Sequence, residues 1–265
     1  MHGLNTARRR VLYLAMSWWA GSQAAWAQRS PPHPDVPPMP DPQARALRLG
    51  TNQHAITQLV AAQLLRDICA RAGFPLQLEP LPGRRATLMA VDGSIDGEVA
   101  RISPYAAANP PLVRVDPPYY ALTTSIFVRK GYPTMIRTLD DLATQHAGVV
   151  GGEVHAEMAA KHARSVVDVG TYDQLYKLLD AGRIDVAIDT GLSGDAEIRR
   201  LRFESRLERQ GDVARYDLHV ILGPRRASLA PLLGNVIRAL RDSGELARLT
   251  REYERQVVEL WIAQA

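Results

Sequence analysis

Short apolar runs alternate with longer amphipathic stretches along the chain from about residue 46 to residue 260. The short runs are typical of strands, and the longer stretches repeat apolar residues three and four positions apart, as a helix with one buried face does. In the stretch 54–72, for example, Ile56, Leu59 and Val60 share such a face. This β–α alternation predicts right-handed parallel units and an α/β fold class. The expected strands are 47–51, 74–81, a strand that begins at Ile95, 123–130, 148–151, 166–169, 184–188 and 216–222, and the expected helices are 54–72, 84–91, 155–164, 171–182, 228–241 and 244–260.

One phrase of the sequence occurs twice. Residues 92–100 read DGSIDGEVA, and residues 180–188 read DAGRIDVAI. In both, a glycine suited to the left-handed position after a helix precedes Ile-Asp and a short apolar strand. A helix, a glycine stop and an apolar strand make half of a parallel βαβ unit. The repeat predicts two similar α/β lobes with a cleft between them, and chance recurrence of a short motif is the alternative.

Two further strands are expected to connect these lobes. The runs near 123–128 and 217–222 carry the chain out of the first lobe and back into it, which predicts a two-strand hinge. Lobe 1 is then formed by residues 46–123 and 223–260, and lobe 2 by residues 126–216. The proline-containing segment between the first repeat strand and the first crossing is expected to be irregular.

The first residues of the chain have the features of an export signal. Three arginines at 8–10 precede an apolar run at 11–20, and Ala-Trp-Ala at 25–27 offers a small-x-small cleavage site. The expected signal peptide is therefore 1–27, which directs the protein to the periplasm. Residues 28–45 are rich in proline and are expected to form a disordered linker.

Composition narrows the range of partners and cofactors. The whole chain has 32 basic and 28 acidic residues, but without the three arginines of the expected signal the basic residues number 29. This near-neutral balance, and the lack of a basic stripe interleaved with aromatic residues, argue against a nucleic-acid partner. The single cysteine, Cys69, excludes an internal disulfide. We expect no cofactor and no metal, because His155, Glu157 and His162 do not have the spacing of a zinc motif.

The order of several motifs resembles the family 3 extracellular solute-binding proteins, the receptors of ABC importers. The motifs are LRLGTN, GSIDGEVARI, PPYYALTTSIFVRK, LDDLA, GVVGG, LYKLLDAGRIDVAID and the closing segment LGPRRASLAPLLGNVIRALRDSGELARL. The resemblance implies a two-lobe, type II periplasmic-binding-protein-like fold that closes by a hinge rotation on a small polar solute. It also implies a membrane permease as partner, and we expect a monomer.

The resemblance also assigns candidate ligand-binding residues on lobe 2. In amino-acid-binding relatives, an acidic residue at the place of Asp189 holds the α-amino group of the ligand; a helix cap or a solvated loop charge is the alternative here. Relatives have Thr or Ser after the glycine that corresponds to Gly152, whereas this chain has Glu153, which would repel a carboxylate. Relatives also have a carboxylate-binding arginine at a position that Asn109 occupies here. We therefore expect a ligand that is not gripped like an ordinary α-amino acid.

The residues of lobe 1 suggest three more ligand contacts. Arg101 follows a buried strand, so it is expected to face the cleft opposite Asp189 and bind an anionic or aromatic group, unless it pairs with Glu98 or Asp96. Tyr119 provides an aromatic wall, with hinge packing as the alternative. Asn52 follows the first strand, where its loop meets the cleft.

We therefore expect solute binding without catalysis, because no nucleophile elbow, P-loop or dinucleotide motif is present. Two alternatives remain open. One is an enzyme on the same fold, similar to the periplasmic cyclohexadienyl dehydratases, with Glu153 as general acid. The other is a sensory subunit that presents its ligand to a membrane receptor.

Overall fold

Nine strands form one mixed sheet in the order β2-β1-β3-β9-β5-β8-β6-β7, with β4 paired to β9. The computed structural model describes residues 46–263, which fall within one compact unit, Pro40–Ala265. The expected signal peptide and the expected linker lie outside the described residues. The strands are β1 (Leu47–Thr51), β2 (Leu76–Pro80), β3 (Gly97–Ile102), β4 (Val113–Arg114), β5 (Tyr120–Arg129), β6 (His146–Val150), β7 (Ser165–Val169), β8 (Val186–Thr190) and β9 (Leu207–Leu222).

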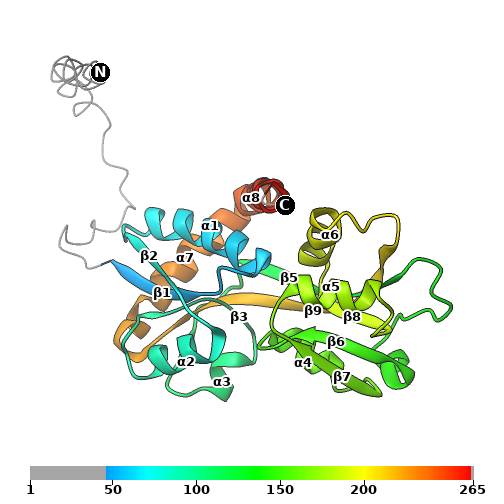
Figure 1. Cartoon of the computed structure of the whole chain (residues 1–265). Coiled ribbons are helices and arrows are strands. Elements are labelled where there is room, and N and C mark those ends of the chain that lie inside the picture. Colours follow the sequence, from blue (N-terminus) through cyan, green and yellow to red (C-terminus); the bar gives the residue numbers. More distant parts are fainter. Residues whose placement is uncertain (1–45, 264–265) are drawn as a thin grey trace, which may run out of the picture. The chain divides into compact units, whose positions relative to one another are not determined.

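The sheet has two similar halves around a central pair of strands. On one side β2, β1 and β3 are parallel, and on the other side β7, β6 and β8 are parallel. Between the halves, β9 and β5 are antiparallel to each other and to their outer neighbours. Figure 1 shows β5 and β9 running from one half to the other. This arrangement confirms the predicted two-lobe α/β fold with a two-strand hinge.

The sheet is continuous through the hinge, because β5 and β9 pair along their whole shared length. The chain therefore crosses twice between lobes without interrupting the hydrogen-bonded ladder. β9 begins at Leu207, well before the strand expected at 216–222. Both crossing strands contain a predicted boundary between the lobes. The residue bounds of the two lobes therefore stay a prediction.

The helices cover the sheet in the expected order, with two additions. The helices are α1 (Ile56–Arg71), α2 (Gly83–Val91), α3 (Tyr105–Ala108), α4 (Val154–Ala160), α5 (Tyr172–Asp180), α6 (Gly191–Arg200), α7 (Ala230–Asp242) and α8 (Glu245–Ile262), with 3₁₀ turns at Asp140–Thr144 and Pro224–Leu229. The sequence pattern did not predict α6. In the segment expected to be irregular, α3 and β4 are short regular elements. Within the described residues, no helix combines the length and apolar character that a membrane span needs.

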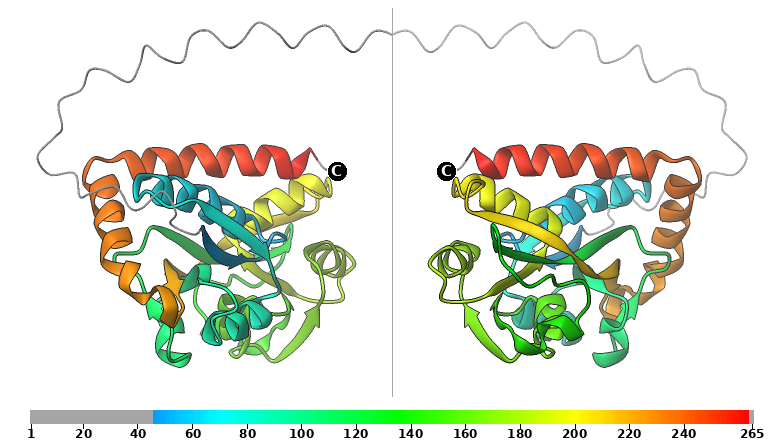
Figure 2. Two further views of the ribbon diagram at one scale, coloured as in Figure 1. Left: turned by 90° about the vertical axis from the view of Figure 1, so that its left-hand side faces the viewer. Right: turned by 90° about the vertical axis from the view of Figure 1, so that its right-hand side faces the viewer.

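One added helix, α6, packs against elements of both lobes. Its N-terminus is capped by Thr190, whose hydroxyl accepts a hydrogen bond from Ser193 N. Ala196 is buried in the large core cluster that α1, α7 and α8 also form. Gly194 lies against Phe127 and Tyr176 of the second half. Figure 2 shows α8, in red, reaching from α7 past α1 to the end of α6. The helix thus connects the two cores beside the hinge.

The repeated Gly-x-Ile-Asp phrase has the same structure in both halves. Gly93 and Gly182 have φ values of +78° and +68°, the left-handed conformation expected after each helix. Asp96 accepts a hydrogen bond from the N–H of Arg48 at the start of β1, and Asp185 accepts one from the N–H of His146 at the start of β6, both at 2.9 Å. The repeat is therefore a structural device that joins each helix–strand unit to the first strand of its half.

Candidate functional site

A cavity of about 570 Å³ lies between the two halves of the sheet. It is large enough for a small polar molecule. Its lining consists of residues at the carboxyl ends of five parallel strands, together with side chains of α6 and α8. The lining residues are Asn52, Gln53, His54, Gln58, 80–83, 100–102, Tyr105, Leu122, 150–155, 170–173, Glu197, Arg200, Leu218 and Trp261. Convergence of strand ends is where open α/β sheets bind ligands.

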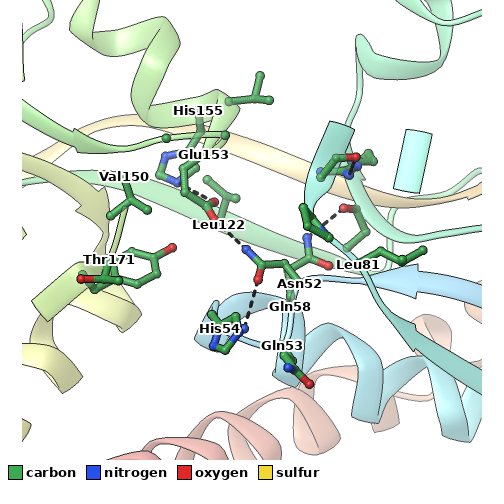
Figure 3. A pocket seen from close by; sticks show the side chains of 18 of the residues that line it. Asn52, Gln53, His54, Gln58, Leu81, Leu122, Val150, Glu153, His155 and Thr171 are labelled. Carbon is green, nitrogen blue, oxygen red and sulfur yellow. Dashed lines mark hydrogen bonds and ion pairs between the residues drawn. The ribbon is translucent and has the colours of Figure 1, made fainter. Parts of the chain in front are cut away.

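Two of the predicted site residues meet across this cavity. Asn52, after β1, donates a hydrogen bond from Nδ2 to Glu153 Oε1, after β6, at 3.1 Å. The Asn52 Oδ1 atom accepts a hydrogen bond from the N–H of His54, which fixes the orientation of the amide. Figure 3 shows Asn52 between Glu153 and His54. Gly152 places Glu153 here through a turn with φ of +87°, a conformation that favours glycine.

Glu153 lies in an environment that favours its neutral form. Burial raises the pKa of its carboxyl group, while hydrogen bonds from Tyr172 and Asn52 and the charge of Arg101 lower it in part. Glu157, one turn further along α4, is a like charge that raises it. A buried carboxylate without full compensation is costly, so this group is sensitive to any cation that enters the cavity.

His155 lies beside Glu153 and is uncharged at neutral pH. Only 3% of its surface is exposed, and burial lowers its pKa to about 4. Its Nδ1 atom is hydrogen-bonded to Thr124 Oγ1 at 3.0 Å. Its Nε2 atom is buried without a hydrogen-bond partner and lies 4.0 Å from Glu153 Oε2. Sequence analysis considered this histidine only as a metal ligand and therefore did not assign it to the ligand site.

Arg101 lines the cavity as predicted, but its charge is already paired. Its Nε atom donates to Glu98 Oε2 at 2.7 Å, and Glu98 is only 1% exposed. Its guanidinium also donates to the carbonyl of Gly83 at 3.2 Å and stacks 4.8 Å from the centre of the Tyr105 ring. A register shift in β3 between Glu98 and Arg101 brings these two side chains together. The ion pair that the sequence left open is therefore present.

Two predicted ligand contacts, Tyr119 and Asp189, do not line the cavity. Tyr119 is 2% exposed and donates a hydrogen bond to the carbonyl of Val99 in the first core, so its role is hinge packing. Asp189 is 1% exposed and accepts hydrogen bonds from Tyr176 and from the N–H of Thr190. Burial raises its pKa well above the usual value. Consequently the structure does not place Asp189 opposite Arg101.

The cavity lining also includes a cluster of charged and aromatic side chains that sequence analysis missed. Glu197 of α6 pairs with Arg200 at 2.8 Å and accepts a hydrogen bond from Trp261 Nε1 of α8 at 2.7 Å. Arg200 also contacts Asp173 at 3.4 Å. The spacing Glu-x-x-Arg is a signal for an ion pair, because residues three positions apart are neighbours on a helix. This signal was not used, since α6 was not predicted. No group of His, Cys, Asp or Glu side chains in the described part of the chain has the arrangement of a metal site.

Solved structures share this architecture, whereas no protein-family model and no curated sequence matches the chain. The GluR0 ligand-binding core in complex with L-glutamate has a TM-score of 0.69 at 15% identity, over 80% of this chain and 99% of that one. A histidine kinase sensor domain with similarity to periplasmic binding proteins has a TM-score of 0.67 at 18% identity, over 79% and 96%. An amino acid ABC transporter substrate-binding protein from Streptococcus pneumoniae, bound to L-arginine, has a TM-score of 0.64 at 16% identity, over 80% and 96%.

These likenesses establish the fold as that of the two-lobe, type II periplasmic-binding-protein-like domains. The neighbours include amino acid transporter proteins, a receptor core and a sensor domain. At these identities the fold is shared, while the ligand and the partner are properties of the individual site.

Proposed function

We propose that the protein binds a small polar solute in the cavity between its lobes and performs no chemistry on it. The observation that carries this proposal is the convergence of both lobes on one cavity, with Asn52 of the first half hydrogen-bonded to Glu153 of the second. Several structural neighbours were solved with amino acids bound, which supports a solute of that size. Hinge motion about β5 and β9 would admit and enclose it.

The test is a thermal-shift screen of the whole chain against amino acids, polyamines, organic acids and sugars. A solute that binds only the folded state raises the melting temperature, by an amount that corresponds to about 2.7 kcal/mol at a hundredfold excess over the dissociation constant. NMR spectra of each hit after prolonged incubation should show an unchanged solute. Failure of every class to raise the melting temperature contradicts the proposal, and conversion of a hit favours an enzyme with Glu153 as acid.

Delivery of the solute to the permease of an ABC importer, from a monomer exported to the periplasm, extends this proposal. The transporter proteins among the structural neighbours support it. The sensor-domain neighbour supports presentation of the solute to a membrane receptor instead. Uptake of a radiolabelled solute by cells with and without the protein separates the two, because only transport requires the protein for accumulation.

A further inference from the structure

One carboxylate in the cavity has no cationic partner. Five lining residues carry formal charges at neutral pH, counting His54 and His155 as neutral. They are Arg101, Glu153, Asp173, Glu197 and Arg200.

Four of these five charges are compensated. Arg101 is paired with Glu98, and Arg200 with Glu197. Asp173 is paired with Lys177 at 2.7 Å. In the described part of the chain, no Lys or Arg lies within ion-pair distance of Glu153. The cavity therefore has one uncompensated negative charge, and it is located at Glu153.

The groups that contact Glu153 are neutral donors and a neutral imidazole, while the charges of Arg101 and Glu157 act on its pKa without an ion pair or hydrogen bond to it. Asn52, from the loop after β1, and Tyr172, from α5, donate hydrogen bonds to it. His155, from α4, places the unpartnered Nε2 atom 4.0 Å from Glu153 Oε2. If the His155 proton is on Nδ1, donating to Thr124 Oγ1, then Nε2 is an acceptor. The ring nitrogen then lacks a donor, and it lies beside a carboxylate oxygen of Glu153 that has no cationic partner.

We propose that the solute is a cation with N–H donors, an ammonium or a guanidinium, and that Glu153 and His155 Nε2 bind its charged group. This inference rests on the proposed function and specifies the solute class. A single N–H cation supplies the missing countercharge of Glu153 and the missing donor for His155 together. An anionic solute is disfavoured, because the guanidinium groups of Arg101 and Arg200 are held by carboxylates that are almost fully buried.

The first experiment compares solutes of matched shape and different charge by calorimetry with the whole chain. The pairs are L-arginine with L-citrulline and putrescine with 1,4-butanediol, and L-glutamate serves as an anion. We expect at least one cation to bind about 30-fold or more tightly than its neutral partner, because its charge meets a partly buried carboxylate without a cationic partner. Binding of only neutral or anionic solutes overturns the inference and leaves the proposed function standing. Failure of all five solutes to bind overturns the inference, and the proposed function falls with it when every class in the thermal-shift screen also fails.

The second experiment removes the charge at Glu153. In Glu153→Gln the side chain keeps its shape and an acceptor for Asn52, so we expect the cation to lose its advantage over the neutral solute. Glu157→Gln is the matched control, since it removes one negative charge from the same helix and keeps an acceptor for the N–H of Gly152. Melting of each variant without solute verifies the fold. Equal cation affinity in Glu153→Gln and the wild type overturns the inference.

The pH dependence of the wild type gives an independent measurement. Burial raises the pKa of Glu153, and a bound cation requires the ionised form. Cation affinity should therefore fall by about tenfold per pH unit below that pKa, while Glu157→Gln keeps this slope and Glu153→Gln loses it. A flat profile in the wild type from pH 8 to pH 4 overturns the inference.

Discussion

At Glu153 and His155, burial moves two neighbouring pKa values in opposite directions. It raises the pKa of the carboxyl group and lowers that of the imidazole, so both groups shift toward their neutral forms. Asp189, in β8 of the same half, is an acid outside the cavity whose pKa burial also raises. The second half of the protein is therefore sensitive to pH through these three groups.

His155 should make the fold less stable in mild acid. Its pKa is 6.5 in the unfolded reference and about 4 in the folded protein, so its contribution to stability is complete above pH 6.5 and is lost as the pH falls toward 4. Replacement by glutamine should remove this loss, which amounts to about 3 kcal/mol over that interval. Urea unfolding of the wild type and His155→Gln at several pH values measures it. Parallel curves for the two proteins would contradict the assignment.

Asp189 should have the opposite pH dependence. Its folded-state pKa lies above the usual value of 3.8, so its contribution to stability is present below that value and is lost as the pH rises through the folded-state pKa. Asp189→Asn removes the ionisation, and should raise the free energy of unfolding at neutral pH, because the folded protein no longer has to hold a buried charge. Unfolding free energies at pH 4 and pH 8 test this. A variant that is destabilised at pH 8 would indicate that Asp189 is needed as an anion.

At the scale of elements, the Gly-x-Ile-Asp phrases attach each helix–strand unit to its neighbour. Asp185 accepts a hydrogen bond from the first N–H of β6, as Asp96 does for β1. Asp96 has an additional ion pair with Arg226, so Asp185 is the simpler of the two to test. The two halves thus share an equivalent hydrogen bond, and its contribution to the free energy of unfolding can be measured at Asp185.

Asp185→Ala should destabilise the protein by about 1–2 kcal/mol, because the N–H of His146 loses a charged acceptor. Chemical unfolding measures the change. The control is Asp140→Ala, which removes a carboxylate that is 94% exposed and should change stability much less. Equal effects of the two substitutions would contradict a structural role for the phrase.

Local signals in the sequence predicted the elements that depend on local chemistry. Thr171, at the start of the expected helix 171–182, caps α5 by accepting a hydrogen bond from Gln174 N, and Gly93 and Gly182 end their helices in the left-handed conformation. In contrast, α6 has two glycines and only a weak apolar face, so it depends on packing against Phe127 and Tyr176 from other elements. Because α6 was not predicted, the cluster of Glu197, Arg200 and Trp261 in the cavity was not predicted either.

The sequence predicted a site residue correctly only where its place at the end of a strand is enough to bring it to the cavity. Asn52, Arg101, Gly152 and Glu153 follow strands at their carboxyl ends, and the structure places all four at the cavity. Asp189 has the same kind of position, but Tyr176 from α5 supplies its hydrogen bond and helps to bury it. The order of the strands along the chain does not predict such contacts between distant elements.

At the scale of the whole described region, the two halves are joined by more than the hinge strands. Asn52 contacts Glu153, and Trp261 of α8 contacts Glu197 of α6. Both contacts connect the halves, and all four residues line the cavity. The arrangement therefore couples closure of the lobes to two hydrogen bonds within the site.

Trp261→Phe should shift the protein toward an open form. The substitution keeps an aromatic ring but removes the donor to Glu197, a carboxylate only 1% exposed, and such a bond contributes about 1.5–3 kcal/mol. If it forms only when the lobes are closed, the ratio of closed to open molecules should fall by about tenfold or more. Spin labels at the exposed positions Leu88 and Val167 report the distance between the halves. Leu260→Ala, at a neighbouring side chain that is 67% exposed, is the control. A distance distribution in Trp261→Phe that matches those of the wild type and the control would mean that this hydrogen bond persists, or is dispensable, when the lobes open.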